Sequence, residues 1–143
     1  MKNSKRYWNE ESETMPLEKL ASRQMEKLDN YIDYAYNNSA YYRRVMDKKK
    51  LKPSDIRTLE DYYAEIPFID KSTLIEEQLN NPPFSDFLAV DQDEIQRLYV
   101  TPGPIFYPYT KEDYDFETNL YSHAFYTNGA RKEDIVDVAM TYH

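Results

Sequence analysis

The sequence predicts an α/β fold in which N-terminal helices cap the start of a mainly parallel sheet. Two observations lead to this prediction. Apolar residues recur at spacings of three, four and seven between Leu17 and Ala35, which is the pattern of a long amphipathic helix. After Pro83 the pattern changes to strand, helix and strand, with strands expected near residues 95–100 and 134–142. Such a unit, here about 45 residues long, implies a right-handed crossover between parallel strands.

The helices expected before Pro83 each begin at a residue that suits a helix N-terminus. These residues are Pro16, Ser39, Thr58 and Asp70. Thr58 is also followed at the third position by Asp61, which predicts a capping box. We therefore expect a long helix from residue 16, a second to about residue 49, a short third helix, and a fourth to about residue 79.

Residues 97–110 carry the most informative local pattern. Leu98, Tyr99 and Val100 are strand formers, and the sequence Thr-Pro-Gly-Pro that follows cannot continue a regular ladder, because proline lacks an N–H group. Gly103 within it is free to adopt a positive φ angle. An extended segment at 105–109 then leads into a helix over 111–127. A strand, a glycine-containing turn and a helix form a layout used for phosphate binding, although an ordinary Pro-Gly turn explains the same residues.

Composition excludes several classes of function. The chain has 143 residues, enough for one domain, and a formal net charge of −8, which argues against nucleic acid as a partner. It contains no cysteine, so disulfides, thiolate catalysis and cysteine-ligated metals are excluded, and a cytoplasmic location is expected. The sequence has no signal-peptide core and no apolar run near the roughly 18 residues that a membrane helix requires.

The C-terminal residue, His143, directly follows the strand expected at 134–142. Parallel sheets are covered on both faces and normally contain more strands than this sequence supplies. We therefore expect the sequence to be the N-terminal piece of a longer protein.

The order and spacing of several segments resemble the beginning of the phenylacetate–coenzyme A ligases, a family of AMP-forming adenylating enzymes. The matching segments are Ile66-Pro-Phe-Ile-Asp-Lys71, Asn81-Pro-Pro-Phe84, Asp93-Glu-Ile-Gln-Arg97, the Thr-Pro-Gly-Pro turn, Tyr109-Thr110, and residues 137–142. The resemblance covers nearly the whole chain, and it is the succession of segments that is specific rather than any one of them.

This resemblance implies an adenylating-enzyme large domain, of which the chain would contain an N-terminal helical region, 1–90, and the incomplete start of the α/β nucleotide-binding subdomain, 91–143. It implies that an aryl or acyl carboxylic acid attacks the α-phosphate of ATP and that coenzyme A then takes the acyl group, with Mg²⁺ assisting. Residues 1–143 alone are predicted to be inactive.

Thr101 and the amides of Gly103 and Ile105 are the predicted nucleotide-phosphate ligands, and Tyr142 and His143 are predicted to border the acyl pocket. The resemblance assigns no catalytic residue within this chain. The scattered carboxylates give no spacing typical of a metal site, so no metal ligand is predicted.

The turn departs from the family pattern, in which a loop rich in serine, threonine and glycine holds the phosphates. Pro102 and Pro104 remove two amide donors from it. Lys71 matches a lysine of the family, but a lysine in the first turn of a helix is expected to be solvated, and His123 is expected to be a surface or packing residue.

Two other interpretations remain open at this level. A degenerate member of the family would act as a non-catalytic binding or regulatory module, and a helical module rich in tyrosine, of which the chain has 15, would mediate interactions only. The sequence also leaves open whether the full-length protein is a homodimer.

Overall fold

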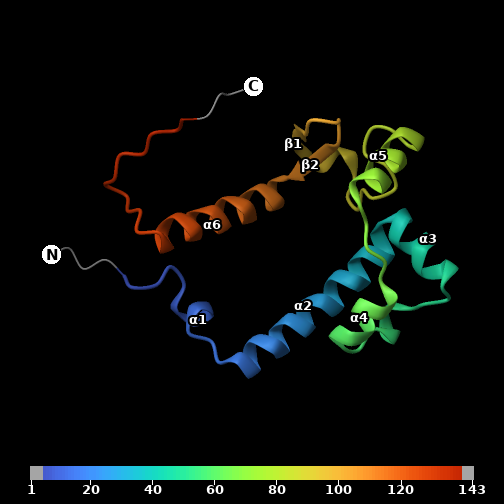
Figure 1. Cartoon of the computed structure of the whole chain (residues 1–143), viewed down its shortest axis with the longest axis horizontal. Helices are drawn as coiled ribbons and strands as arrows, with labels where there is room; N and C mark the ends of the chain where they lie inside the picture. The colour runs from blue at the N-terminus through green and yellow to red at the C-terminus, as the bar shows by residue number, and fades with distance from the viewer. Residues whose placement is uncertain (1–4, 140–143) are drawn as a thin grey trace. The chain divides into compact units, whose positions relative to one another are not determined.

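The computed structural model describes residues 5–139 and divides into two compact units (Figure 1). The hairpin unit consists of residues 16–112. The terminal unit combines the N-terminal residues up to Met15 with the residues from Asp113 onwards. Helix α6 (Lys111–Thr127) begins in the hairpin unit and continues in the terminal unit.

The hairpin unit contains the four helices that the sequence predicts. They are α2 (Leu17–Asn38), α3 (Ala40–Lys48), α4 (Leu59–Glu65) and α5 (Lys71–Asn80), with short 3₁₀ helices at Pro53–Asp55 and Gln92–Glu94. The predicted caps are confirmed. The Ser39 side chain accepts a hydrogen bond from the Tyr42 amide, Asp70 accepts one from Thr73, and Thr58 and Asp61 form a reciprocal capping box.

The core of the hairpin unit lies where α2, α3 and the chain that follows them meet. Ile32, Met46, Leu51 and Ile56 form one buried cluster, and Met46 is only 2% exposed. Partly buried side chains pack around this cluster: Leu28, Tyr36, Tyr62 and Ile66. Of the apolar stripe that predicts α2, Leu28 and Ile32 therefore join the core, whereas Leu17 and Tyr31 stay exposed.

A polar network ties α3 and α5 to the segment that follows α5. Arg44 of α3 makes a bidentate contact with Glu77 of α5 at 2.8 and 2.9 Å and a second ion pair with Asp86 at 2.5 Å. Asn81 donates to the same Asp86 carboxylate at 2.8 Å. The Asp86 carbonyl in turn accepts hydrogen bonds from the Tyr41 amide and the Ser39 hydroxyl, both at 2.9 Å. These contacts fix α5 against the helical core.

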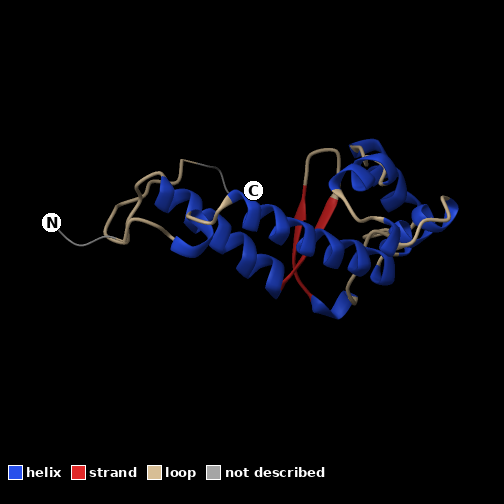
Figure 2. Cartoon of the chain, turned by 90° about the horizontal axis from the view of Figure 1, so that it is seen from below, coloured by secondary structure: helices blue, strands red, loops and turns tan. Residues whose placement is uncertain are grey.

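The two strands, red in Figure 2, pair with each other. Strands β1 (Ile95–Val100) and β2 (Phe106–Thr110) are antiparallel, with Val100 opposite Phe106 and Tyr99 opposite Tyr107. The expectation of a mainly parallel sheet is therefore not met by the described residues. The sequence predicted that 95–100 would share a parallel sheet with 134–142. Instead β1 pairs with β2, because the five residues that join them suffice for a hairpin, whereas a parallel pair needs a crossover of about a dozen residues or more.

The strand predicted for 134–142 is also absent over residues 134–139, where the chain is irregular and Ile135 is fully exposed. A strand exists only where its backbone groups pair with a neighbour, and no described strand pairs with residues 134–139. Residues 140–143, including Tyr142 and His143, lie outside the described residues.

The terminal unit is built on α6 and a short helix, α1 (Glu10–Glu13). Trp8 packs on Tyr126 with ring centroids 5.5 Å apart and donates through Nε1 to Asn119 at 3.1 Å. Gly129, at φ 96°, ends α6: its amide donates to the Tyr126 carbonyl, and the next amide, from Ala130, donates to the Phe125 carbonyl. This is the pairing of a Schellman cap.

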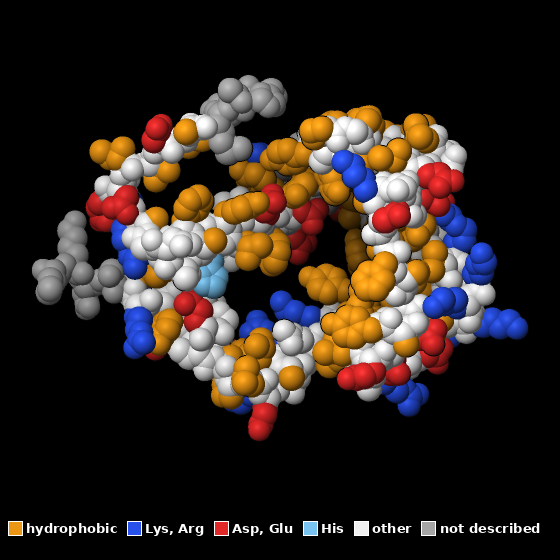
Figure 3. Space-filling view, in the orientation of Figure 1, with side chains coloured by type: hydrophobic (Ala, Val, Ile, Leu, Met, Phe, Trp, Pro, Cys, Tyr) orange, Lys and Arg blue, Asp and Glu red, His pale blue; other side chains and the backbone are white. Residues whose placement is uncertain are grey.

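Many large hydrophobic side chains reach the surface, where Figure 3 shows them in orange. The most exposed are Ile135 (100%), Phe68 (96%), Leu17 (81%) and Leu79 (77%). In the part of the chain that the structure describes, no helix combines the length and apolar character that crossing a membrane requires.

Candidate functional site

The turn between β1 and β2 has the geometry that its sequence predicts. A hydrogen bond from the Thr101 amide to the Ile105 carbonyl, 3.1 Å long, closes it. Gly103 adopts φ 92°, a region that side chains with a Cβ atom rarely enter. Pro102, Gly103 and Pro104 are exposed, whereas Ile105 is 3% exposed. The turn therefore presents its tip to solvent and is anchored by Ile105.

Lys71, which the sequence predicts to be solvated, contacts this turn. Its Nζ atom donates to the Pro102 carbonyl at 3.1 Å. A Cβ atom built on Gly103 would lie 3.5 Å from the same Nζ atom. Lys71 lies in the first turn of a helix, as the sequence predicts. Nothing in the local pattern, however, connects Lys71 with the turn at Pro102, 31 positions away. The contact puts an ammonium group beside the turn whose two prolines lack amide donors.

Asp70, next to Lys71, remains a carboxylate that caps α5. The amide and hydroxyl of Thr73 donate to it, each at 2.8 Å, and these bonds hold the pKa of Asp70 below its ordinary value. The first turn of α5 is thereby fixed, and Lys71 projects from a well-ordered helix start.

Thr101 is the one predicted ligand with a side-chain donor. Its Oγ1 atom is buried and has no hydrogen-bond partner among the described residues. An unsatisfied buried hydroxyl costs about 1–3 kcal/mol, and a ligand that reached the Thr101 Oγ1 atom would remove this cost. The Thr101 amide, by contrast, is already used to close the turn.

The arrangement of Thr101, Gly103 and Lys71 fits an anionic group better than a metal ion. It offers a hydroxyl that can donate, a backbone that an anion can approach closely, and an ammonium group, which has donors only and repels a cation. Within residues 5–139, no three histidine or acidic side chains come close enough together to hold a metal ion. No residue is therefore assigned to Mg²⁺.

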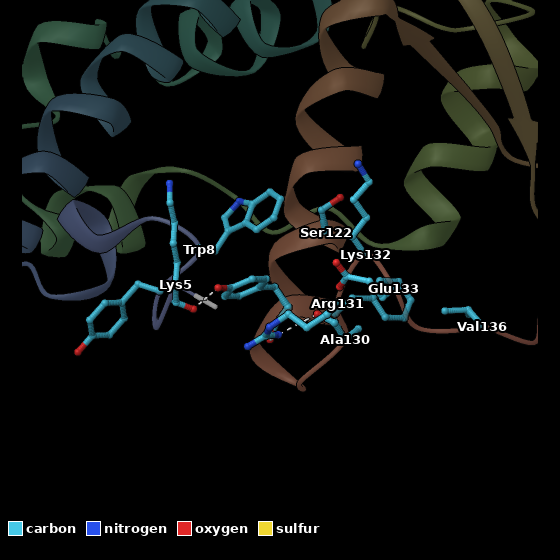
Figure 4. Close-up of a pocket in the computed structure, with 11 residues that line it drawn as sticks. Lys5, Trp8, Ser122, Ala130, Arg131, Lys132, Glu133 and Val136 are labelled. Carbon is cyan, nitrogen blue, oxygen red and sulfur yellow. Dashed lines mark hydrogen bonds between the residues drawn. The ribbon is translucent and has the colours of Figure 1, made fainter. Parts of the chain in front are cut away.

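A second concave surface lies in the terminal unit and was not predicted from the sequence. This groove of about 1130 Å³ is lined by Trp8, Tyr126, Arg131 and their neighbours (Figure 4). The Arg131 guanidinium stands 3.9 Å from the centre of the Tyr126 ring and donates to the carbonyls of Tyr126 and Ala130 at 2.9 and 2.8 Å. Arg131 is thus engaged in closing the end of α6.

A third concave surface, of about 500 Å³, belongs to the hairpin unit. Its lining is apolar and aromatic, with Tyr31, Tyr42 and Phe68 among the contributing side chains. Burial raises the pKa of Tyr42 above its ordinary value, so the Tyr42 hydroxyl stays neutral. Neither groove contains a residue of the predicted site.

Comparison with solved structures places the fold of the chain in a class of enzyme. The chain superposes on 2-hydroxyisobutyryl-CoA ligase in the postadenylation state, in complex with 2-HIB-AMP, with a TM-score of 0.85 and 29% identity over 90% of this chain and 27% of the ligase. The same ligase with 2-HIB-AMP and CoA in the thioesterification state gives a TM-score of 0.76 and 28% identity over 83% of this chain and 26% of the ligase. The fold is therefore that of part of an adenylating CoA ligase.

Comparison with known sequences narrows the class. The chain is 34% identical over 125 residues to the phenylacetate–coenzyme A ligase of Thermus thermophilus, and 32% identical over 134 residues to that of Pseudomonas putida. These alignments cover 85 and 91% of this chain but 27 and 29% of the two ligases. No family model matches the chain. The chain is homologous to the phenylacetate–coenzyme A ligases and spans less than a third of their length.

Proposed function

We propose that this chain supplies the phosphate-facing turn of an AMP-forming ligase that activates an aryl or acyl carboxylic acid with ATP and transfers it to coenzyme A. The observation that carries the proposal is the match, at a TM-score of 0.85, to a CoA ligase bound to an acyl adenylate. The identities to phenylacetate–coenzyme A ligases support the same reaction class and favour an aryl acid. The proposal places the enzyme in the cytoplasm, which a chain without cysteine suits.

In this function ATP supplies the adenylyl group and pyrophosphate leaves. The residues of this chain bind and orient the phosphates. Thr101 donates its hydroxyl to a phosphate oxygen, and Gly103 allows close approach of the phosphate to the backbone. Lys71 supplies positive charge at the turn, which compensates for the donors that the prolines remove.

The test is calorimetric titration of the full-length protein with ATP, together with acid-dependent exchange of pyrophosphate into ATP. Thr101→Val removes the hydroxyl at nearly constant volume. We expect ATP to bind about ten- to a hundredfold more weakly, the effect of losing a hydrogen bond to a charged group. The unliganded variant should melt no lower than the wild type, because the hydroxyl that it loses has no partner.

Thr127→Val is the matched control, because the Thr127 hydroxyl donates to the His123 carbonyl within α6. This variant should bind ATP as the wild type does. Equal ATP affinity of Thr101→Val and the wild type would remove Thr101 from the site. A wild-type protein that neither binds ATP nor exchanges pyrophosphate with any aryl or acyl acid would overturn the proposed function itself.

A further inference from the structure

Helix α5 holds the chain at both ends of the turn. At one end Lys71 donates to the Pro102 carbonyl at 3.1 Å. At the other end the Gln78 side-chain amide donates to the Phe106 carbonyl at 2.8 Å and accepts from the Phe106 amide at 3.0 Å. The Gln78 side chain therefore pairs with the backbone of β2 as a neighbouring strand would.

The two contacts are matched in spacing. Lys71 and Gln78 are seven residues apart, two helical turns, so they lie on the same face of α5 and about 10.5 Å apart along its axis. Their partners, Pro102 and Phe106, are four residues apart, and four extended residues reach at most about 14 Å. The segment between the contacts therefore spans the distance between them with about one residue's length to spare.

The turn has few means of fixing its own conformation. Pro102 and Pro104 offer no amide donors, and the hydrogen bond from Thr101 to the Ile105 carbonyl closes the turn without orienting it toward the rest of the unit. Burial of Ile105 adds one apolar anchor. The orientation of the exposed tip at Gly103 must come from contacts with another element, and α5 provides them at both ends.

We propose that Lys71 and Gln78 are positioning residues: together they brace the Thr101–Ile105 turn against α5 and fix the conformation in which it meets the nucleotide phosphates. That this conformation serves phosphate binding rests on the function proposed above. The brace itself is a property of the hairpin unit and is measurable without nucleotide. Gln78 makes the tighter contact of the two, since it satisfies a donor and an acceptor of the same residue.

The experiment measures amide hydrogen exchange in the full-length protein without nucleotide, and ATP affinity at a temperature well below melting. In Gln78→Leu the Phe106 amide loses its acceptor, and we expect it to exchange about tenfold faster or more. The affinity for ATP should fall at least threefold, because the turn must then be ordered on binding. Gln24→Leu, the same substitution at an exposed position of α2, should change neither quantity.

Conservative variants separate positioning from a general loss of structure. Gln78→Glu keeps an acceptor for the Phe106 amide but has no donor for the Phe106 carbonyl, so exchange at Phe106 should stay near that of the wild type while ATP affinity is intermediate. If Gln78→Leu does not fold, the ATP affinity of Gln78→Glu still tests whether the Gln78 side chain positions the turn. Lys71→Met should shift the amide resonance of Gly103, Lys71→Arg should restore it, and Lys27→Met on α2 should leave it unchanged.

If the Phe106 amide hydrogen of Gln78→Leu exchanged as slowly as in the wild type, the proposal that Gln78 braces the turn would be wrong. Faster exchange with unchanged ATP affinity would overturn its role in positioning the turn for nucleotide. A wild-type protein that binds no ATP would overturn the proposed function. Amide hydrogen exchange at Phe106 would still decide whether α5 fixes the turn.

Discussion

The two glycines of the chain, Gly103 and Gly129, both adopt positive φ angles, 92° and 96°. They differ in their surroundings. A Cβ atom on Gly103 would meet the Lys71 side chain at 3.5 Å, whereas one on Gly129 would meet nothing within 4 Å. Substitutions at these two glycines therefore distinguish the free-energy cost of backbone strain, which both share, from the effect of disturbing the turn, which only Gly103 has.

We predict that Gly103→Ala and Gly129→Ala each lower the free energy of unfolding by about 1–2 kcal/mol, because alanine is strained in the left-handed region. Only Gly103→Ala should also weaken ATP binding. Urea denaturation and calorimetric titration of both variants check this. If Gly129→Ala weakened ATP binding as much as Gly103→Ala, the turn would have no special part in binding.

At the scale of residues, the sequence predicted what depends on neighbours along the chain. The positive φ of Gly103 and the caps at Ser39, Thr58 and Asp70 follow from local steric and hydrogen-bonding rules, and the structure confirms them. The contact of Lys71 with Pro102 joins residues 31 positions apart, and no local rule contains it. Whether Thr101, Gly103 and Ile105 bind phosphate stays a prediction.

At the scale of elements, helices were predictable and strand pairing was not. A helix satisfies its backbone within itself, so the periodicity of α2 and the caps of α3 to α5 are sufficient signals. A strand depends on a partner. The prediction that 95–100 pairs in parallel with 134–142 ignored the short Pro-Gly connection, which favours a hairpin between β1 and β2. Over 134–139 the apolar pattern is present but no partner strand is.

The ion pairs of Arg44 make the attachment of α5 dependent on pH. Hydrogen bonds from Arg44, together with one from Asn81, hold the pKa of Asp86 below its ordinary value of 3.8. A carboxyl group with a lowered pKa stabilises the folded state above its ordinary pKa, and this contribution is lost as pH falls through the lower, folded value.

We predict that Arg44→Met is less stable than the wild type at pH 7, by about 1 kcal/mol or less for these partly exposed pairs. The difference in the free energy of unfolding should start to narrow near pH 3.8, where unfolded Asp86 takes up a proton, and should be lost as pH falls through the lower pKa of folded Asp86. Urea denaturation at pH 7, 5, 3.5 and 2.5 measures this difference. Arg23→Met on α2 is the control. If the stability difference between Arg44→Met and the wild type did not change with pH, the pH dependence would not come from the Arg44–Asp86 ion pair.

At the scale of the whole molecule, the described residues bury a small core and expose many large apolar side chains. Contiguous exposed apolar surface marks sites that pack against other polypeptide. Phe68 and Leu79, exposed at 96 and 77%, are far more accessible than core residues such as Ile32, at 6%. Within residues 5–139, apolar surface therefore remains that these residues themselves do not cover.

We predict that this polypeptide by itself binds a hydrophobic dye and shows no acid-dependent exchange of pyrophosphate into ATP. Replacing Phe68 and Leu79 together by serine should reduce dye binding and change stability little, by about 0.5 kcal/mol per site, because neither side chain is buried. Ile32→Ser, in the core, should instead unfold the hairpin unit. Efficient exchange by residues 1–143 would contradict the prediction.

The position of the core along the chain has a consequence for synthesis on the ribosome. The buried cluster spans Ile32 to Ile56, and its outermost partner is Ile66, so it is complete before the turn is translated. The contacts that attach α5 end at Asp86. At about 5–20 residues per second, the chain from Asp86 to Phe106 takes about 1–4 s to add, whereas helices form within about a microsecond. We therefore expect α5 to be packed against the core already when Phe106 emerges from the ribosome. The β1–β2 hairpin would then form against a helix that is already in place.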